Sequence, residues 1–282
     1  RKYTRPRSQI GAVKAAISTA TPRAPSLDRA GVIECCLIME APRETNPPLL
    51  TPVATPESKA ASGKRVVVIM PAYNAERTLP ACHAALPRDL IDHVILTDDA
   101  SADGTVALAR TLPIEVLVHP ENRGYGANQK TCYRAALASG ADVVVMVHPD
   151  HQYDPRMIPA LLGPLFTGTV DAVFGSRMLG GRPLEGGMPK WKYIANVFLT
   201  AIANVVFYMF LTEYHSGFRA YSRRYLETVR FEEDADGFVF DTEIIAQGVT
   251  CGMRFAEIPI QTRYFPEASQ IGFASSVRYG FA

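Results

Sequence analysis

The sequence predicts an α/β fold with a mostly parallel central sheet that carries helices on both faces. The first observation is an alternation, from residue 64 onward, of short apolar runs with segments of helical pattern, which is typical of βαβ units. The second is that the apolar runs are continuous rather than alternating, as in strands buried on both faces. The chain of 282 residues is 48% apolar, which is enough to fill a large core.

The expected elements follow one another in a regular order. Strands are predicted at 65–70, 93–97, 114–119, 142–147 and 171–176. Helices are predicted between them, near 76–86, 103–112, 125–139 and 155–165. Each helix provides the crossover that a parallel strand pair requires. We therefore expect the carboxyl ends of the strands to share one edge of the sheet, where ligands bind in folds of this class.

The first 62 residues differ in composition from the rest. They hold 8 of the 21 prolines and a single aromatic residue, Tyr3, and they include runs rich in Ser, Thr, Pro and Ala. Such a segment buries too little apolar surface to offset the entropy of ordering the chain. The sequence therefore predicts a disordered N-terminal arm over residues 1–62 and one folded domain over residues 63–282.

Charge, cysteine content and missing motifs exclude several classes of protein. The formal net charge is +1, so no nucleic-acid partner is expected. Five cysteines without a C-x-x-C pair argue against a disulfide framework and a zinc site, and they favour a reducing, cytoplasmic compartment. The first strand is followed by PAYN rather than G-x-G-x-x-G, and G-x-x-x-x-G-K-[ST] does not occur in the sequence. A Rossmann-type dehydrogenase thereby loses its main support, and P-loop enzymes are excluded.

Six short segments occur in a characteristic order between about residues 65 and 265: PAYNAERTL, TDDASADGT, NRGYGANQKT, HPDHQ, VFGSR and YHSGFRAYSRR. In this order they resemble landmarks of the family 2 glycosyltransferases of the GT-A fold. The resemblance is greatest to the dolichol-phosphate mannose synthase branch and its bacterial polyprenyl-phosphate relatives. It implies a metal-dependent, inverting hexosyltransferase with Mg²⁺ or Mn²⁺ as cofactor. The implied reaction moves a sugar from a UDP- or GDP-sugar donor to a polyprenyl or dolichyl phosphate.

A nucleotide-sugar donor requires an aromatic ring for its base, acceptors for the ring N–H of the base, and a cation for the diphosphate. The residues expected to bind the donor are Pro71, Tyr73, Glu76, Asp98, Asp99, Arg123 and Gly124. Tyr73 would stack on the base, and Asp98 or Asp99 would accept its hydrogen bond. Alternatives remain open: Tyr73 as a packing residue, one of the two aspartates as a turn or cap residue, and the segment NRGYG as an ordinary glycine-bearing loop.

The fourth predicted strand runs into the segment HPDHQ, which begins with His148. The resembling family has Asp-x-Asp at this point, and its second carboxylate holds the metal. The resemblance therefore implies that Asp150 is a metal ligand, and Gln152 is also retained from the family's pattern. For His148 three roles remain open: a metal ligand, a hydrogen-bond partner of Asp150, and a strand-end residue without a role in the site. Asp154, directly before a proline, is predicted to cap the next helix.

Arginines in the second half of the chain are candidates for binding an acceptor phosphate, because a guanidinium group suits phosphate geometry. They are Arg177, Arg219 and Arg263. Asp241 and Glu243 are predicted to begin a helix. Their open roles are a general base for a hydroxyl acceptor, a partner of a donor hydroxyl or an arginine, and helix-terminal acids stabilised by the dipole. The alternative functions are a glycosyltransferase with a hydroxyl acceptor and a catalytically silent nucleotide-sugar-binding module.

Residues 190–211 are predicted to form an amphipathic helix at a membrane surface. Asn196, Thr200 and Asn204 recur every four residues and would form a polar stripe beside a broad apolar face. The segment KWKY at its start combines cations with amphipathic rings, as expected at the headgroup level. A helix buried against the sheet and a short transmembrane span are the alternatives. The preferred interpretation is a protein held peripherally on the cytoplasmic face of a membrane.

Overall fold

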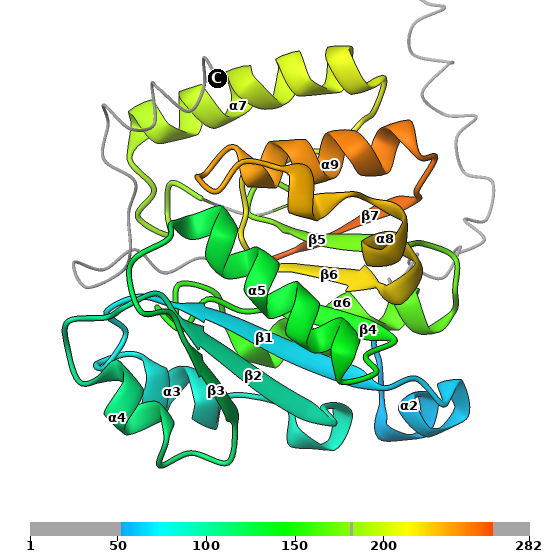
Figure 1. Cartoon of the computed structure of the whole chain (residues 1–282). Helices are drawn as coiled ribbons and strands as arrows, with labels where there is room; N and C mark the ends of the chain where they lie inside the picture. The colour runs from blue at the N-terminus through cyan, green and yellow to red at the C-terminus, as the bar shows by residue number, and fades with distance from the viewer. Residues whose placement is uncertain (1–51, 181–182, 262–282) are drawn as a thin grey trace, which may run out of the picture. The chain divides into compact units, whose positions relative to one another are not determined.

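The computed structural model describes residues 52–180 and 183–261 of the chain. The chain divides into two compact units, residues 1–49 and 50–282, and all the described residues belong to the second. Most of the predicted N-terminal arm and Arg263 lie outside the described ranges. Figure 1 shows the second unit as a central sheet with helices on both faces.

Within the described residues the sheet contains seven strands in the order β3-β2-β1-β4-β6-β5-β7. Their bounds are β1 Val66–Ala72, β2 His93–Asp98, β3 Glu115–Val118, β4 Val143–Met146, β5 Ala172–Ser176, β6 Arg219–Ser222 and β7 Phe255–Pro259. Neighbouring strands run parallel except at β6, which is antiparallel to both β4 and β5. The prediction of a mostly parallel sheet is confirmed, and each of the five strands predicted above matches one of β1 to β5.

Helices cover both faces of this sheet (Figure 1). Their bounds are α2 Pro56–Ser62, α3 Leu79–Ala84, α4 Thr105–Ala109, α5 Tyr125–Ala138, α6 Ile158–Phe166, α7 Lys190–Phe207, α8 Arg223–Thr228 and α9 Phe240–Thr250. Three 3₁₀ turns complete the described elements: η1 Arg88–Leu90, η2 Pro155–Met157 and η3 Phe231–Glu233. The predicted cap at Asp154 is confirmed, because its side chain accepts a hydrogen bond from the backbone N–H of Arg156 at 3.0 Å, at the start of η2.

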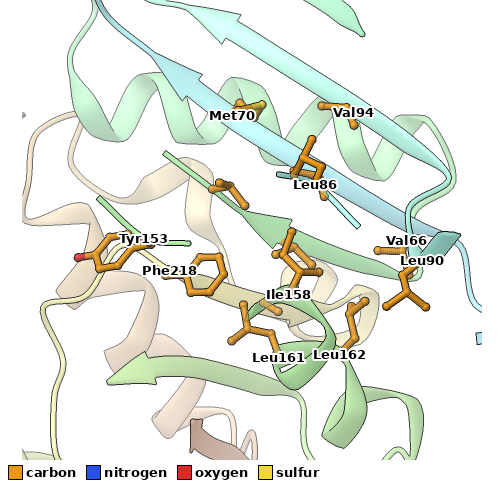
Figure 2. Close-up of a cluster of buried hydrophobic side chains, with 14 of the residues drawn as sticks. Val66, Met70, Leu86, Leu90, Val94, Tyr153, Ile158, Leu161, Leu162 and Phe218 are labelled. Carbon is orange, nitrogen blue, oxygen red and sulfur yellow. The ribbon is translucent and has the colours of Figure 1, made fainter. Parts of the chain in front are cut away.

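Side chains of β1 alternate between two apolar clusters, one on each face of the sheet. Val66, Val68 and Met70 enter the cluster that includes residues of α3 and α6, part of which is drawn in Figure 2. Val67 and Ile69 enter the cluster formed with α5, α8 and α9. Because both faces of β1 are buried, its first residues are all apolar, and its carboxyl end is held in a fixed position.

Residues 52–62, the last part of the predicted disordered arm, are ordered in the structure. α2 begins with a capping box, which satisfies backbone N–H groups at its start. The backbone N–H of Ala54 donates to the carbonyl oxygen of Pro159 at 2.8 Å, and Lys59 pairs with Asp92 at 2.7 Å. The boundary predicted at the end of this segment is therefore wrong. Capping and contacts with the domain offset the chain entropy that composition alone suggested would prevail.

α7 turns apolar side chains outward and polar side chains toward the protein. Asn196 and Thr200 are buried, whereas Phe198 and Val205 are 63% and 75% exposed. The large apolar residues exposed on and just after this helix are Trp191, Ile194, Val197, Phe198, Ile202, Val205, Val206, Tyr208 and Phe210. Across the described ranges, no helix combines the length and the hydropathy needed to cross a membrane.

Candidate active site

A cavity of about 840 Å³ opens at the carboxyl ends of the parallel strands. Because β6 runs against its neighbours, its amino-terminal end reaches the same edge and brings His215 and Gly217 into the wall. α7 supplies another side of the wall. The predicted site residues that line the cavity are Pro71, Tyr73, Asp99, Gly124, His148, Asp150, Gln152, Arg177 and Asp241. Those absent from its lining are Glu76, Asp98, Arg123, Arg219 and Glu243.

Tyr73 stands in the wall directly after β1, next to Pro71. It is 55% exposed, so its ring contributes little to the packing of the domain. An aromatic ring with an accessible face is suited to stacking against a planar base. Of the two roles considered for Tyr73, the structure favours ligand stacking over core packing.

The two aspartates that end β2 have separate roles. Asp98 is buried and accepts hydrogen bonds from the backbone N–H and the hydroxyl of Ser101, at 2.8 and 2.5 Å, so it is the turn residue of the pair. Asp99 lines the cavity, and its carboxylate accepts from the backbone N–H groups of Arg123 and Gly124, both at 2.9 Å. Asp99 therefore fixes the loop that carries Gly124 into the cavity wall.

Gly124 has φ +97°, and a Cβ there would lie 2.7 Å from the carbonyl oxygen of Asp236. Only glycine adopts this φ without strain and leaves room for the Asp236 carbonyl, so the loop depends on Gly124.

The side chain of Arg123 is exposed outside the cavity. Glu76 accepts a hydrogen bond from the backbone N–H of Gly104 at 3.0 Å and so joins the loops that follow β1 and β2. Glu76 thus has a structural partner instead of the donor, and Arg123 lies outside the lining of the cavity.

His148 is held by two neighbours in the cavity wall. Its ring stacks on that of Tyr125, with the centroids 5.6 Å apart, and its Nε2 lies 3.3 Å from the Tyr125 hydroxyl. It also forms a hydrogen bond with the backbone of Pro71. Burial lowers the pKa of His148, although the charges of Asp150 and Asp241 oppose this effect. The imidazole is therefore neutral at neutral pH and is ordered by the protein itself.

Asp150 is half-buried at the floor of the same cavity, and its Oδ1 accepts a hydrogen bond from the backbone N–H of Gln152 at 3.1 Å. Burial raises the pKa of the Asp150 carboxyl, while His148 and this hydrogen bond act in the opposite direction. A cation near Asp150 would favour its charged form. Among the described residues, no three side chains of His, Cys, Asp or Glu form a metal-binding group. The chemistry nevertheless fits a hard cation that takes one carboxylate and completes its shell with water and phosphate oxygens.

Arg219 is only 1% exposed and lies behind the cavity wall. Its guanidinium pairs with Asp241 at 3.2 Å and donates to the carbonyl oxygens of Ser216 and Tyr214, at 2.6 and 2.8 Å. The N–H groups of the Arg219 guanidinium are therefore used in bonds within the protein. The structure therefore corrects the prediction that Arg219 contacts the acceptor, because this residue instead braces the segment before β6.

Asp241 lines the cavity from the first turn of α9 and is held by hydrogen bonds. It accepts from the hydroxyl of Tyr125 at 3.0 Å and from the side-chain amide of Gln129 at 3.1 Å, in addition to the ion pair with Arg219. Of the roles left open for Asp241, pairing with an arginine is the one that the structure contains. Glu243 faces away from the cavity and accepts from a backbone N–H in the loop before α9 at 2.6 Å. Its geometry supports a structural role and not catalysis.

Arg177 lines the part of the cavity next to α7 and is paired with Glu213. Its Nε and its backbone N–H donate to the two carboxylate oxygens of Glu213, each at 2.7 Å. Lys192 of α7 lines the same part, where burial and the charge of Arg177 lower its pKa. His215 lies in the same part of the cavity wall. Burial lowers the pKa of its imidazole to about 4, so the ring is neutral at neutral pH. Two cations and one carboxylate leave this part of the site positive.

Tyr125, Phe238 and Glu213 belong to the site, although the sequence alone does not identify them as site residues. The rings of Tyr125 and Phe238 lie 4.8 Å apart in the cavity wall. Tyr125 had a weak signal, since it stands between two glycines at the start of a predicted helix. Glu213 had another, as an acidic residue that follows a long apolar run. Neither signal identifies a partner, and the partners are what give these residues their roles.

Comparison with known proteins is consistent with this site. A family model described as glycosyl transferase family 2 matches residues 67–230. The chain is 30% identical to the undecaprenyl-phosphate mannosyltransferase of Micrococcus luteus, an alignment that covers 70% of this chain and 82% of that protein. It is 28% identical to the polyprenol monophosphomannose synthase of Mycolicibacterium smegmatis, with 70% and 77% covered.

A solved structure agrees in fold. The glucosyl-3-phosphoglycerate synthase of Mycobacterium tuberculosis, crystallised with Mn²⁺, UDP and phosphoglyceric acid, superposes with a TM-score of 0.64 at 20% identity. The match covers 82% of this chain and 80% of that one. This likeness supports the predicted GT-A fold and says nothing of substrates. With the family model matching more than half of the chain, the sequence and the fold lead to one conclusion: the protein is an enzyme that belongs to glycosyl transferase family 2.

Proposed function

We propose that the protein transfers a hexosyl group, with inversion, from a UDP- or GDP-sugar to a polyprenyl or dolichyl phosphate, assisted by Mg²⁺ or Mn²⁺. The observation that carries the proposal is that acidic and basic side chains lie in separate parts of the cavity along one edge of the sheet. Asp99 follows β2 and Asp150 follows β4, whereas Arg177 follows β5 and faces Lys192 of α7. One cavity thus offers the Asp150 carboxylate for a cation-bound diphosphate and, apart from it, cations for a second phosphate.

The acidic part of the cavity suits the donor. Tyr73 would stack on the base, and the loop that Asp99 holds would line the nucleotide. Asp150 would hold the divalent cation, which neutralises the diphosphate as it becomes the leaving group. The same cofactor class occurs in the M. tuberculosis synthase, which has been crystallised with Mn²⁺ or Mg²⁺ together with UDP.

The basic part suits an acceptor that is already an anion. A lipid phosphate needs no general base, because its oxygen is a charged nucleophile at neutral pH. Asp241, the carboxylate that would deprotonate a hydroxyl acceptor, already accepts hydrogen bonds from Tyr125 and Gln129 and pairs with Arg219. A base needs a free lone pair directed at the acceptor. This favours the phosphate acceptor over a hydroxyl acceptor, and Arg177 with Lys192 would orient the phosphate for in-line attack at the anomeric carbon.

The outer face of α7 suits a lipid surface. Ile194, Val205 and Val206 are exposed on this helix outside the cavity, whereas Trp191, Lys192, Phe198 and Ile202 line it. A helix of this kind can lie in the membrane interface without spanning it. The acceptor headgroup would then enter the cavity from the cytoplasmic face of the membrane, which is where we expect the enzyme to act.

A screen of UDP- and GDP-sugars with Mn²⁺, with and without a polyprenyl phosphate, tests this proposal by scoring donor hydrolysis and lipid product. We expect lipid-linked sugar with one nucleotide sugar, and at least a 100-fold loss of turnover in Asp150→Asn, because removing a transition-state charge contact typically costs that much. Asp154→Asn is the matched control, since Asp154 caps η2 outside the cavity and Asn still caps. Full activity in Asp150→Asn would remove the cation assignment. Product on a hydroxyl acceptor alone would overturn the acceptor class.

A further inference from the structure

A single buried carboxylate joins the basic part of the cavity to α7. The Glu213 side chain has no exposed surface. Its Oε1 accepts from the Arg177 Nε at 2.7 Å and also from the side-chain amide of Asn196 at 2.8 Å. Its Oε2 accepts from the backbone N–H of Arg177 at 2.7 Å. One oxygen therefore serves both an arginine of the cavity wall and a residue of the helix that closes the cavity.

The orientation of the Asn196 amide follows from its neighbour one turn later. The Thr200 hydroxyl donates to the amide oxygen of Asn196 at 3.3 Å, which directs the amide N–H group toward Glu213. Both residues belong to the buried side of α7. The inward polar side of the helix is thus a directed chain of hydrogen bonds that ends on the carboxylate beside Arg177.

Glu213 is itself held from the far side. Its backbone N–H donates to Glu257 of β7 at 3.0 Å, and that of Thr212 donates to the same side chain at 2.7 Å. Burial opposes ionisation of Glu213, yet the charge and hydrogen bonds of Arg177 lower the pKa of its carboxyl below the ordinary value. The carboxylate is therefore charged, and the backbone that carries it is fixed to β7.

We propose that Glu213 is a positioning residue that sets the guanidinium of Arg177 for the acceptor phosphate, and that α7 holds Glu213 in place through Asn196. The inference rests on the proposed function, because it assigns Arg177 to the acceptor. Loss of the Asn196 hydrogen bond leaves the carboxylate tied on one side only and allows Arg177 to move with it. Binding of the phosphate acceptor then depends on the docking of α7, whereas binding of the donor does not.

Two variants of α7 test this coupling. Asn196→Leu removes the hydrogen bond to Glu213 and keeps a side chain of similar size. Asn204→Leu is the matched control, because Asn204 lies on the same side of α7 but bonds to the backbone of Leu211 and to Tyr214, not to Glu213. We expect Asn196→Leu to raise the KM for a polyprenyl phosphate about 5- to 10-fold, less than the full effect of losing a hydrogen bond to a charged group, because Asn196 acts on the acceptor only through Glu213 and Arg177. Donor affinity should change less than twofold, and the control should leave the acceptor KM within twofold.

Hydrogen exchange at the Arg177 amide gives a readout that does not depend on activity, since this N–H donates to Glu213. It should exchange at least fivefold faster in Asn196→Leu than in Asn204→Leu. Equal KM increases in both variants would mean that α7 acts only as a wall, and no increase in either would mean that Glu213 holds Arg177 unaided; each result overturns the proposal. If the wild type used no phosphate acceptor, the proposed function would fail, but the exchange experiment would still decide whether Asn196 positions Glu213.

Discussion

At the scale of single residues, His148 marks how this chain departs from its family. The position expected to carry a carboxylate holds an imidazole that is stacked on Tyr125 and bonded to the backbone of Pro71. Gly217 lies against this ring, and a Cβ there would come within 2.7 Å of its Nε2. The ring thus fills space between β1, α5 and the segment before β6, and Asp150 remains the acidic residue at the end of β4.

His148→Asp should strengthen cation binding. It places a second hard, charged oxygen donor near Asp150, and Mg²⁺ favours carboxylates over imidazole. We expect the Mg²⁺ concentration for half-maximal turnover to fall about 3- to 10-fold, measured by titrating the cation at fixed donor. His148→Asn supplies an oxygen without the charge and should produce a smaller change. A well-folded but inactive His148→Asp enzyme would show instead that the imidazole has a specific role beside Tyr125.

At the scale of elements, the packing of residues 52–55 on α6 depends on one glycine. A Cβ at Gly163 would overlap the carbonyl oxygen of Pro52. Glycine in a helix costs about 0.5–1 kcal/mol relative to alanine. Its presence at this position of α6 is explained by the close approach of the N-terminal segment, which also places Ala54 in the core.

The effect of Gly163→Ala on the free energy of unfolding should therefore depend on whether residues 52–55 are present. In the full chain we expect a loss of about 1–3 kcal/mol in the free energy of unfolding, as in other overpacked sites. In a chain that begins at residue 63, the change should be within about 0.5 kcal/mol of zero. The better helix propensity of alanine is opposed there by Pro164, which disfavours a helical residue with a Cβ before it. Urea unfolding of each chain with and without Gly163→Ala measures the change in the free energy of unfolding. Equal losses in the full and the shortened chain would contradict the contact between Pro52 and Gly163.

At the scale of the whole molecule, α7 reverses the usual arrangement of an amphipathic helix. Its polar side chains are bonded to the protein, and apolar side chains such as Ile194, Val205 and Val206 are exposed. Large exposed apolar patches mark surfaces that bind a partner or a membrane. Because the same helix bounds the proposed acceptor site, the lipid surface that we propose as partner would account for both of its sides.

We expect the protein to co-sediment with vesicles that contain anionic lipid. Replacing Val205 and Val206 together by Glu should reduce the bound fraction at least fivefold, because charge at the interface opposes apolar burial and is repelled by anionic headgroups. Val118→Glu is the control, as it adds an acid at an exposed apolar residue of β3, an element separate from α7. Affinity for the nucleotide sugar should stay unchanged in all variants. Wild-type protein found wholly in the supernatant would contradict the membrane surface.

The sequence by itself determined the parallel strands and the residues that follow them. A continuous apolar run such as VVVIM is typical of a strand whose two faces are both buried in the protein. Parallel strands connected by helices have their carboxyl ends at the same edge of the sheet. The sequence therefore predicts that Tyr73, one of Asp98 and Asp99, and Asp150 lie at one site, and it leaves the role of His148 open. These features depend on residues adjacent in the chain, and local pattern is sufficient to predict them.

The tertiary structure alone decided which polar groups remain available for chemistry. Arg219 and Arg177 look equivalent in sequence, and both guanidinium groups are bonded within the protein, yet Arg219 lies behind the cavity wall with Asp241, whereas Arg177 lines the cavity beside Glu213. Likewise, the polar stripe of α7 can be read from its spacing, but its partner Glu213 cannot. A hydrogen bond between groups far apart in sequence depends on the packing of the elements that carry them, and its energy arises only when that packing has excluded water from both groups.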